Sequence, residues 1–302
     1  MMMLLVLLLQ LSTSTSAEEE SFEVSLIQQR LELRLSSDVN QKAGREKYNI
    51  LCVGDSITYG CGASYSEKSY PKQLQELLGQ EFQVYNFGDS HGTARKRHGE
   101  PLDMHAVRTH DLHSYWDSDI FKNALEHADI ADAVVIMIGT NDAKAWAHQD
   151  LNRTQHLMEF RSDYTELVGL FQNASSQPKV YLMVPPPLYS DLSTIVRDWN
   201  QTFINTVLPV EISQLAQATG AQLAGSAFSA YKELCPISSS GTCPLMLGLP
   251  FPQYCNTDVL PTPFVGNMLP KVSDGLHPGD EGYKVIADVV FGALSVDFPT
   301  EG

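Results

Sequence analysis

The sequence predicts an α/β protein in which helices cover both faces of a central parallel sheet, giving three layers. Short apolar segments alternate with longer segments whose apolar residues recur at helical spacing. This alternation implies right-handed crossovers between neighbouring parallel strands. Residues 133–138 are continuously apolar, which is typical of a central strand that is buried on both faces. With 302 residues, of which 43% are hydrophobic, the chain can bury one full core.

The expected elements follow one another in alternating order. Five segments are predicted to be strands because apolar residues dominate them: residues 49–53, 82–87, 133–138, 179–184 and, with the weakest pattern, 221–224. Four segments carry a helical apolar stripe: residues 70–78, 158–172, 199–218 and 282–294. Polar residues that follow the strands should therefore lie at one edge of the sheet, where parallel α/β proteins bind ligands.

Two long segments interrupt this alternation. Residues 98–117 are rich in His and Asp, and residues 232–270 are rich in Pro, Gly and Ser and contain three cysteines. Loops of this length inside a compact domain are usually functional or disordered. We therefore treat residues 232–270 as an insertion in the domain.

Five cysteines allow two disulfides at most. Cys235, Cys243 and Cys255 lie close together in the insertion and are expected to form loop disulfides in an oxidising compartment. Cys61 could also reach them, because it follows the first candidate serine loop. Cys52 lies within the first strand and is expected to be a free, buried thiol. The spacing lacks the paired C-x-x-C segments of structural zinc sites, so no zinc is expected there.

Residues 1–17 are predicted to be a secretory signal peptide. Their apolar core is too short to cross a bilayer, and Thr15 and Ala17 provide the small residues of a cleavage site after Ala17. A polar N-terminal extension, residues 18–47, follows. Three Asn-x-Ser/Thr sequons fit a secreted glycoprotein: Asn152, Asn173 and Asn200. The expected location is the extracellular space or the lumen of the secretory pathway.

The charge of the chain narrows the classes of partner. The formal net charge of −16 argues against nucleic acid and anionic membranes as partners. Beyond the N-terminal apolar core, no segment is long and apolar enough to span a bilayer. We expect a monomer that acts on a small-molecule or carbohydrate substrate without stable insertion into a membrane.

The tripeptide Gly-Asp-Ser occurs twice, each time at the end of a predicted strand. Ser90 also fits the G-x-S-x-G nucleophile elbow of α/β-hydrolases, but such an elbow needs a helix directly after the serine. Residues 93–101 have no helical apolar stripe and contain Gly and Pro. Ser56 lies in a polar, Gly-rich turn, and the helix of residues 70–78 follows after a loop. We therefore predict Ser56 as the nucleophile; the alternative is a serine that only stabilises a turn.

Asp274 and His277 lie three residues apart, just before the last predicted helix. Gly275 gives the turn conformational freedom, and Pro278 prevents the helix from extending upstream. The Asp274 carboxylate can then accept a hydrogen bond from Nδ1 of the imidazole while Nε2 faces a serine hydroxyl. A serine, a histidine and an aspartate in these roles predict a serine hydrolase that reacts through an acyl-enzyme.

Two strand ends offer donors for a developing oxyanion. Asn141 follows the most apolar strand, and its side-chain amide can donate a hydrogen bond. Asn86 ends the second strand with two glycines behind it, Gly88 and Gly92, and glycine lets a backbone N–H approach the reacting oxygen closely. Because these residues and Ser56 all follow strands, they are expected at one edge of the sheet.

These motifs resemble those of the SGNH hydrolases, the GDSL-type esterase and lipase family. The resemblance spans roughly residues 48–298, with matching blocks at residues 54–60, 139–142 and 274–278. It implies a flavodoxin-like fold without cofactor or metal. It assigns Ser56 as nucleophile, His277 as general base and then acid, and Asp274 as the residue that orients His277. The oxyanion hole would combine the Ser56 N–H, a glycine N–H of the second block and the Asn141 amide.

The second block departs from the family pattern. Family members usually read Asn-x-Gly-x-x-Gly, whereas one further residue separates Gly88 from Gly92 here. We assign the glycine donor to Gly92, with Gly88 as the fallback. The insertion of residues 232–270 is also longer than the link expected before the last block.

The segment after the fourth strand bears on the substrate. Residues 179–189, which end in three prolines, Leu and Tyr, resemble family members that deacetylate sugars, including sialate O-acetylesterase-like proteins. We therefore expect a secreted esterase for short-chain acyl groups, with O-acetyl groups on carbohydrate as its substrate. A lysophospholipase or lipase of the same family is one alternative, and a non-catalytic secreted binding module is the alternative from another class.

Basic and aromatic residues beyond the second block offer possible substrate contacts. Arg95 and Arg97 belong to a basic cluster that could hold an anionic group such as a sugar carboxylate, although a solvated charged turn is the alternative. Trp116 could stack on a sugar ring. Three histidines nearby allow a metal site as a further alternative, although no metal is expected: His105, His110 and His113.

Overall fold

The structure is a computed structural model of the chain, and it describes residues 47–96, 112–146, 152–189, 199–235, 243–247 and 275–299. The predicted signal peptide, the N-terminal extension up to Glu46 and much of the insertion lie outside these ranges. So do the following residues with predicted roles: Arg97, His105, His110, Cys255 and Asp274.

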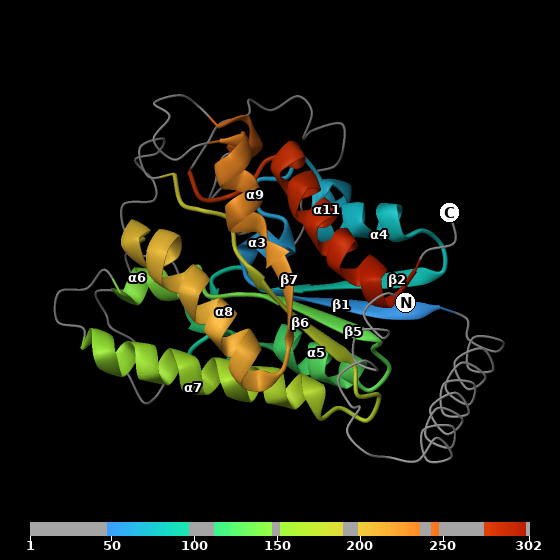
Figure 1. Ribbon diagram of the computed structural model, residues 1–302, viewed down its shortest axis with the longest axis horizontal. Coiled ribbons are helices and arrows are strands. Elements are labelled where there is room, and N and C mark those ends of the chain that lie inside the picture. Colours follow the sequence, from blue (N-terminus) through green and yellow to red (C-terminus); the bar gives the residue numbers. More distant parts are fainter. Residues whose placement is uncertain are drawn as a thin grey trace, which may run out of the picture. The chain divides into compact units, whose positions relative to one another are not determined.

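Five parallel strands form the central sheet, in the order β2-β1-β5-β6-β7 (Figure 1). They are β1 (Tyr48–Gly54), β2 (Phe82–Gly88), β5 (Ala133–Met137), β6 (Lys179–Val184) and β7 (Gln222–Ser226). The chain moves from β1 to one edge and then returns to build the other side. This is the doubly wound, flavodoxin-like order, so the predicted fold class is confirmed.

Alternate residues of the central strands enter two separate cores. On β5, Val134 and Ile136 belong to one core, and Val135 and Met137 belong to the other. The period of two places successive side chains on opposite faces of a strand, and all four are buried here. A continuously apolar strand is therefore needed where both faces of the sheet are covered.

Helices cover each face of the sheet (Figure 1). The first core is closed by α5 (Asp119–Ala128), α7 (Arg153–Gln172) and α8 (Leu208–Thr219). The second core is closed by α4 (Tyr70–Leu78), α9 (Ala227–Leu234) and α11 (Asp280–Asp297). The three predicted layers are thus present in the described part of the chain.

Short elements follow several of the strands. They are α3 (Ser56–Tyr59), η1 (Ser66–Lys68), β3 (Gly92–Thr93), β4 (His113–Ser114), η3 (Tyr115–Asp117), α6 (Asp142–Trp146), η5 (Phe203–Val207) and η6 (Pro244–Met246). The η5 segment is a π-helical turn that leads into α8. A small parallel pair, β3 with β4, lies apart from the main sheet in the hydrogen-bond pattern.

The predicted strands and helices are present with shifted ends. The fourth strand and the first helix have the predicted bounds, whereas α7 begins at Arg153, five residues before the predicted start. Asn152 explains the earlier start, because its side chain caps the helix by accepting the Gln155 N–H. The helices α3, α5 and α9 were not predicted.

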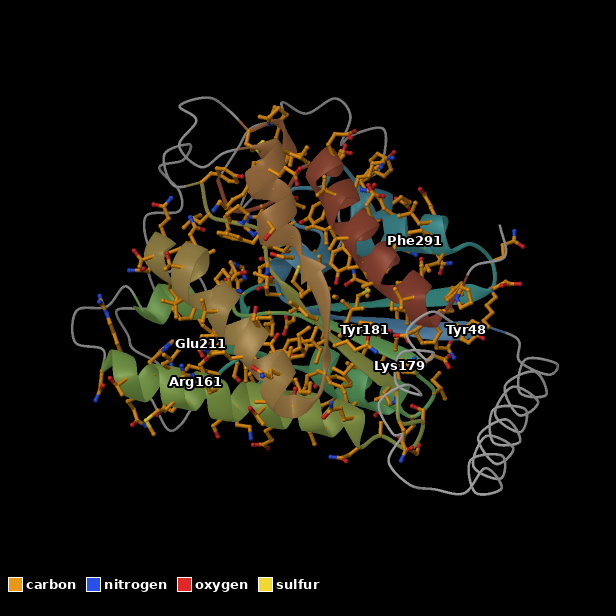
Figure 2. The ribbon with its side chains drawn as sticks, viewed as in Figure 1. Tyr48, Arg161, Lys179, Tyr181, Glu211 and Phe291 are labelled. Carbon is orange, nitrogen blue, oxygen red and sulfur yellow. A yellow bond between two sulfur atoms is a disulfide. The ribbon has the colours of Figure 1, made fainter. Side chains whose placement is uncertain are left out.

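Ion pairs and hydrogen bonds between side chains join helices to their neighbours (Figure 2). Arg161 on α7 donates from Nε to Glu211 on α8 at 2.5 Å, and a second guanidinium nitrogen reaches the other carboxylate oxygen at 2.7 Å. Lys179 and Tyr181 of β6 both contact Asp297 at the end of α11. Among the helices of the described ranges, none combines the length and the apolar character needed to cross a bilayer.

Candidate active site

Ser56 is the first residue of α3, directly beyond the carboxyl end of β1. Asp55 caps this helix, because its Oδ1 accepts the Ile57 N–H at 3.0 Å. Gly60, in the left-handed region with φ of 110°, ends the helix after four residues. The serine side chain is therefore held by a short helix, where the sequence had suggested only a loop.

His277 meets Ser56 from the other end of the chain. Ser56 Oγ lies 3.0 Å from Nε2 of His277, although 221 residues separate them. Both residues are buried, with exposed fractions of 5% for Ser56 and 3% for His277. Asp274 lies outside the described residues, so its contact with His277 stays a prediction.

Asn141 follows β5 and lies near the second Gly-rich loop. Its Nδ2 donates to the Gly92 carbonyl oxygen at 3.0 Å, and the side chain is buried. Because an amide nitrogen carries two hydrogens, this contact leaves one for another acceptor. Asn141 and Ser56 thus both follow strands of the sheet at the same edge, as the sequence suggested.

The two candidate glycine donors already have acceptors. The Gly92 N–H donates to the Asp89 carbonyl at 3.0 Å, which closes a turn, and the Gly88 N–H donates to Asn86 Oδ1 at 2.9 Å. His91 lies within this turn at a positive φ of 70°. An oxyanion could take either glycine N–H only by replacing its acceptor, so the choice between them stays a prediction.

Gly88 also permits close packing around the serine. A Cβ at this position would lie 2.0 Å from the Tyr59 nitrogen of α3. No side chain fits between β2 and α3 at that distance. A glycine here thus allows the helix that begins at Ser56 to lie directly against the end of β2.

Two buried carboxyl groups lie beneath the site. Burial raises the pKa of Asp55 to about 7, although the Ile57 N–H and nearby His277 act in the opposite direction. Burial likewise raises the pKa of Asp142 to about 6, while N–H groups of Ala94 and Arg95 stabilise its charged form. These aspartates change charge in the pH range in which a histidine base operates.

Ser90, the serine of the other Gly-Asp-Ser copy, has different neighbours. Its Oγ lies 3.3 Å from Nδ1 of His91 and 3.8 Å from Sγ of Cys61. The chain continues into the short strand β3, not into a helix. The geometry of a nucleophile elbow is therefore missing at Ser90.

The predicted substrate-binding residues have partners inside the protein. The Arg95 guanidinium pairs with Glu159, and its side chain is 8% exposed. Trp116 donates from Nε1 to the Ala94 carbonyl at 2.9 Å, and Nζ of Lys96 lies 4.1 Å from the centre of a Trp116 ring. These contacts favour an internal role for Arg95 over the expected contact with an anionic substrate.

His113, one of the three histidines considered for a metal site, contacts a carboxylate. Its Nε2 lies 2.7 Å from Oδ2 of Asp89. Over the ranges that the structure describes, no group of three His, Cys, Asp or Glu side chains is placed to hold a metal ion. His113 and Asp89 instead connect β4 with the loop after β2.

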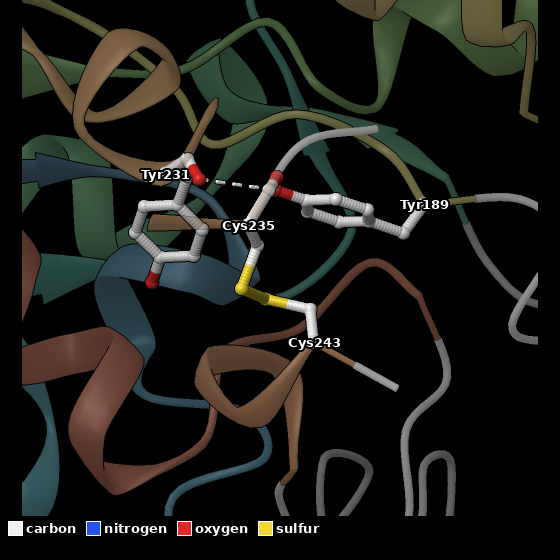
Figure 3. Close-up of a disulfide and its surroundings, with 4 residues drawn as sticks. All are labelled: Tyr189, Tyr231, Cys235 and Cys243. Carbon is white, nitrogen blue, oxygen red and sulfur yellow. Dashed lines mark hydrogen bonds between the residues drawn. A yellow bond between two sulfur atoms is a disulfide. The ribbon is translucent and has the colours of Figure 1, made fainter. Parts of the chain in front are cut away.

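The described cysteines follow the predicted pattern. Cys235 and Cys243 form a disulfide (Figure 3). Cys61 is also disulfide-bonded, and Cys52 is free and buried. Next to the disulfide, Tyr189 donates from its hydroxyl to the Cys235 carbonyl at 2.7 Å. The prediction of loop disulfides is confirmed for Cys235 and Cys243.

Several residues that shape the site were not predicted from the sequence. They are Asp55, Asp142, Ser64 and Asp280, of which the first two lie beside predicted site residues. One available signal was the spacing around Ser56, where an Asp precedes the serine and a Gly follows four residues later. That pattern predicts a capped helix of one turn.

The fold, together with the contact between Ser56 and His277 at the carboxyl edge of the sheet, indicates the class of the protein. A five-stranded, doubly wound sheet presents a serine and a histidine in hydrogen-bond contact, as in hydrolases that act on ester bonds. The model of the GDSL-like lipase/acylhydrolase family matches residues 52–227. The chain belongs to this family, so the predicted family is confirmed.

A curated relative is similar over most of this chain. An acetylxylan esterase of Xylanibacter ruminicola is 24% identical over 266 residues, which make up 81% of this chain and 42% of that protein. The chain thus spans well under half the length of this relative.

Solved structures are similar at the level of the fold. The lipase/acylhydrolase from Enterococcus faecalis is 17% identical, with a TM-score of 0.50, over 84% of this chain and 99% of that chain. A carbohydrate acetylesterase from Sinorhizobium meliloti is 17% identical, with a TM-score of 0.48, over 83% and 100%. The likeness to the first structure supports the fold.

Proposed function

We propose that this chain is a secreted serine esterase that removes short-chain acyl groups, in particular O-acetyl groups of carbohydrates. The observation that carries the proposal is the 3.0 Å distance between Ser56 Oγ and His277 Nε2 in a member of an acylhydrolase family. A proton can pass directly between these atoms at that distance. The similarity to an acetylxylan esterase supports acetyl esters of carbohydrate as substrates.

Acylation begins with Ser56. Its Oγ attacks the carbonyl carbon of the ester and forms the new C–O bond, while its proton passes to Nε2 of His277. Asp274 is expected to accept the Nδ1–H and so to fix the tautomer with an unprotonated Nε2. The carbonyl oxygen becomes an oxyanion in the tetrahedral intermediate.

Three donors are assigned to that oxyanion. The Ser56 N–H belongs to the first residue of α3, where backbone N–H groups have no acceptor within the helix. Asn141 supplies the second hydrogen of its amide nitrogen, since the first donates to Gly92. The Gly92 N–H joins them if the turn closed by Asp89 opens when substrate binds.

Collapse of the intermediate completes each half of the reaction. The imidazolium of His277 protonates the leaving alkoxide, the C–O bond of the ester breaks, and Ser56 keeps the acyl group. A water molecule then attacks the acyl-enzyme while His277 accepts its proton and returns it to Ser56. One water is consumed, and one alcohol and one carboxylic acid are released.

Covalent labelling tests the assignment of the nucleophile. A fluorophosphonate probe should label the wild-type chain and Ser90→Ala, because the probe phosphorylates an activated serine. Ser56→Ala should give no label while it retains its thermal unfolding transition. Equal labelling of Ser56→Ala would mean that another residue is the nucleophile, and no labelling of the folded wild-type protein would support the binding-module alternative.

A substrate panel tests the acyl and alcohol preferences. Nitrophenyl acetate, nitrophenyl octanoate, acetylated xylan and lysophosphatidylcholine should be compared by kcat/KM. We expect faster hydrolysis of acetate than of octanoate and release of acetate from xylan. Preferential hydrolysis of the lysolipid would instead favour the lysophospholipase alternative.

Secretion is proposed from the N-terminal segment and supported by the disulfides. Disulfides persist in oxidising compartments, and Cys235, Cys243 and Cys61 are all disulfide-bonded. Expression in cells with a secretory pathway should deliver the protein to the medium with Glu18 as its first residue. Retention of residues 1–17 on protein inside the cell would exclude this route.

A further inference from the structure

Hydrogen bonds join the loop after α3 to the first turn of α11. The Ser64 N–H donates to Asp280 Oδ1, and the Ser64 hydroxyl donates to Asp280 Oδ2, each at 2.8 Å. Ser64 is 1% exposed. One carboxylate therefore takes both donors of one buried serine, which is a two-point contact between segments 216 residues apart.

A second contact connects the same two segments. The Tyr283 hydroxyl donates to the Cys61 carbonyl, and the ring is fully buried. The Cys61 N–H in turn donates to the Ser56 carbonyl at 3.0 Å. A short series of hydrogen bonds thus leads from α11 to the backbone of the serine. We call the Ser64–Asp280 and Cys61–Tyr283 contacts the α11 latch.

The loop also packs directly against the residue that carries the imidazole. A Cβ on Gly62 would lie 2.6 Å from the Pro278 carbonyl oxygen and 3.1 Å from Cβ of His277. Gly62 has a φ of 89°, which other residues rarely adopt. There is no room for a side chain between this loop and the histidine.

We infer that Asp280 is a positioning residue that sets the distance between Ser56 and His277. Asp280 follows His277 by three residues, and its partner Ser64 follows Ser56 by eight. The contact between Ser64 and Asp280 therefore joins the segment that carries the serine to the segment that carries the histidine. The inference rests on the proposed function, in which Ser56 and His277 exchange a proton. A misplacement of about 1 Å can reduce catalysis on the order of 100-fold.

The other end of the same helix provides a matched control. Asp297, the last residue of α11, accepts hydrogen bonds from Lys179, Tyr181 and Gln222. Its carboxylate fastens α11 to β6 and β7, and no contact of this cluster reaches Ser56 or His277. Loss of Asp297 should therefore reduce stability without changing the reacting distance.

The experiment compares Asp280→Ala with Asp297→Ala in the full chain. Each is assayed with nitrophenyl acetate for kcat and KM, well below its own unfolding temperature. Asp280→Ala should lower kcat by about 10- to 100-fold with KM changed by less than about threefold, and Asp297→Ala should keep both within about threefold. Equal kcat values for these two variants would overturn the inference.

Two milder variants guard against misfolding and separate position from charge. Asp280→Asn can still accept the Ser64 N–H and donate to its hydroxyl, so it should recover most of the kcat lost in Asp280→Ala. Ser64→Ala keeps the hydrogen bond from the Ser64 backbone N–H, so its kcat should lie between those of Asp280→Ala and Asp280→Asn. A failure of Asp280→Asn to recover activity would contradict a role that depends on position.

Ser56→Ala separates this inference from the proposed function. Full activity of Ser56→Ala would overturn the proposed function itself. Loss of activity in Ser56→Ala, together with matching kcat values for Asp280→Ala and Asp297→Ala, would overturn the latch alone.

Discussion

The two Gly-Asp-Ser loops lie side by side with the same three residues and different surroundings. Gly54 and Gly88 are register partners of the adjacent strands β1 and β2, so the tripeptides leave the sheet together. The Asp89 N–H even donates to the Gly54 carbonyl at 2.8 Å. Local sequence and position in the sheet are thus nearly equal, so the two serines differ mainly in the chain that comes after each of them.

After Ser56 the chain forms a helix, and after Ser90 it forms a turn and a strand. Asp55 caps its helix by accepting the Ile57 N–H, whereas the Asp89 carboxylate contacts the His113 imidazole. The difference shows that a Gly-Asp-Ser tripeptide does not define a nucleophile. The partner histidine and the start of a helix distinguish the two serines.

The largest expected effect tests the two serines against each other. Ser56→Ala should lower kcat/KM by about 10⁴-fold or more, because it removes the attacking atom. Ser90→Ala removes contacts with His91 and Cys61 and should keep kcat/KM within about threefold. Hydrolysis of nitrophenyl acetate measures both, and a larger loss in Ser90→Ala would reverse the assignment.

Asn141 donates a hydrogen bond to Gly92 behind the second loop, and its replacement should give the next largest effect. Asn141→Ala removes the proposed oxyanion donor and the hydrogen bond to the Gly92 carbonyl. We expect kcat to fall by about 10²- to 10³-fold with a small change in KM. Asn141→Asp serves as a control that keeps the shape and repels an oxyanion. If it were as active as the wild type, the assigned role of Asn141 would be wrong.

Much of the fold could be predicted because apolar periodicity reports burial directly. The run at β5 predicted a central strand, and the structure buries every residue of it. The unpredicted helix α5 also had a signal, since Ser118 caps it and Phe121, Ala124 and Ala128 are its buried residues at helical spacing. This helix was missed because it directly follows an irregular segment.

The site could be predicted less completely, since its electrostatics depend on contacts between distant segments. Arg95 looked like a free cation in an acidic chain, but Glu159 on α7 pairs with it. The contact of Ser64 with Asp280 likewise joins residues 216 positions apart. No local pattern encodes such pairs, whereas the Asp-His spacing before α11 is local and was found.

Substitution of the aspartates of the two Gly-Asp-Ser loops, Asp55 and Asp89, should change stability in opposite directions. The larger effect is expected for Asp55. Asp55→Asn keeps an acceptor for the Ile57 N–H and removes a buried carboxyl whose pKa is raised from 3.8 to about 7. Between these pH values Asp55 is ionised in the unfolded chain and protonated in the folded protein, so the wild type loses stability as the pH rises, whereas the variant does not. The variant should therefore become more stable than the wild type by about 1–3 kcal/mol above about pH 7.

Urea unfolding at several pH values measures this difference. The gain of Asp55→Asn should be absent near pH 4, rise up to about pH 7 and then stay constant. A gain that is the same at every pH would mean that folding does not shift the pKa of the Asp55 carboxyl.

Asp89 should show the smallest effect, with the opposite sign. Asp89→Ala removes the contact with the His113 imidazole and should cost about 1 kcal/mol of unfolding free energy. The side chains of Asp89 and His113 are 10% and 32% exposed. A double-mutant cycle with His113→Ala isolates the pair from other losses. Since the Gly92 N–H bonds the backbone carbonyl of Asp89, the turn should persist and kcat should change less than about threefold. A large loss of kcat would mean that the contact between Asp89 and His113, and not the backbone, holds the second loop against the first.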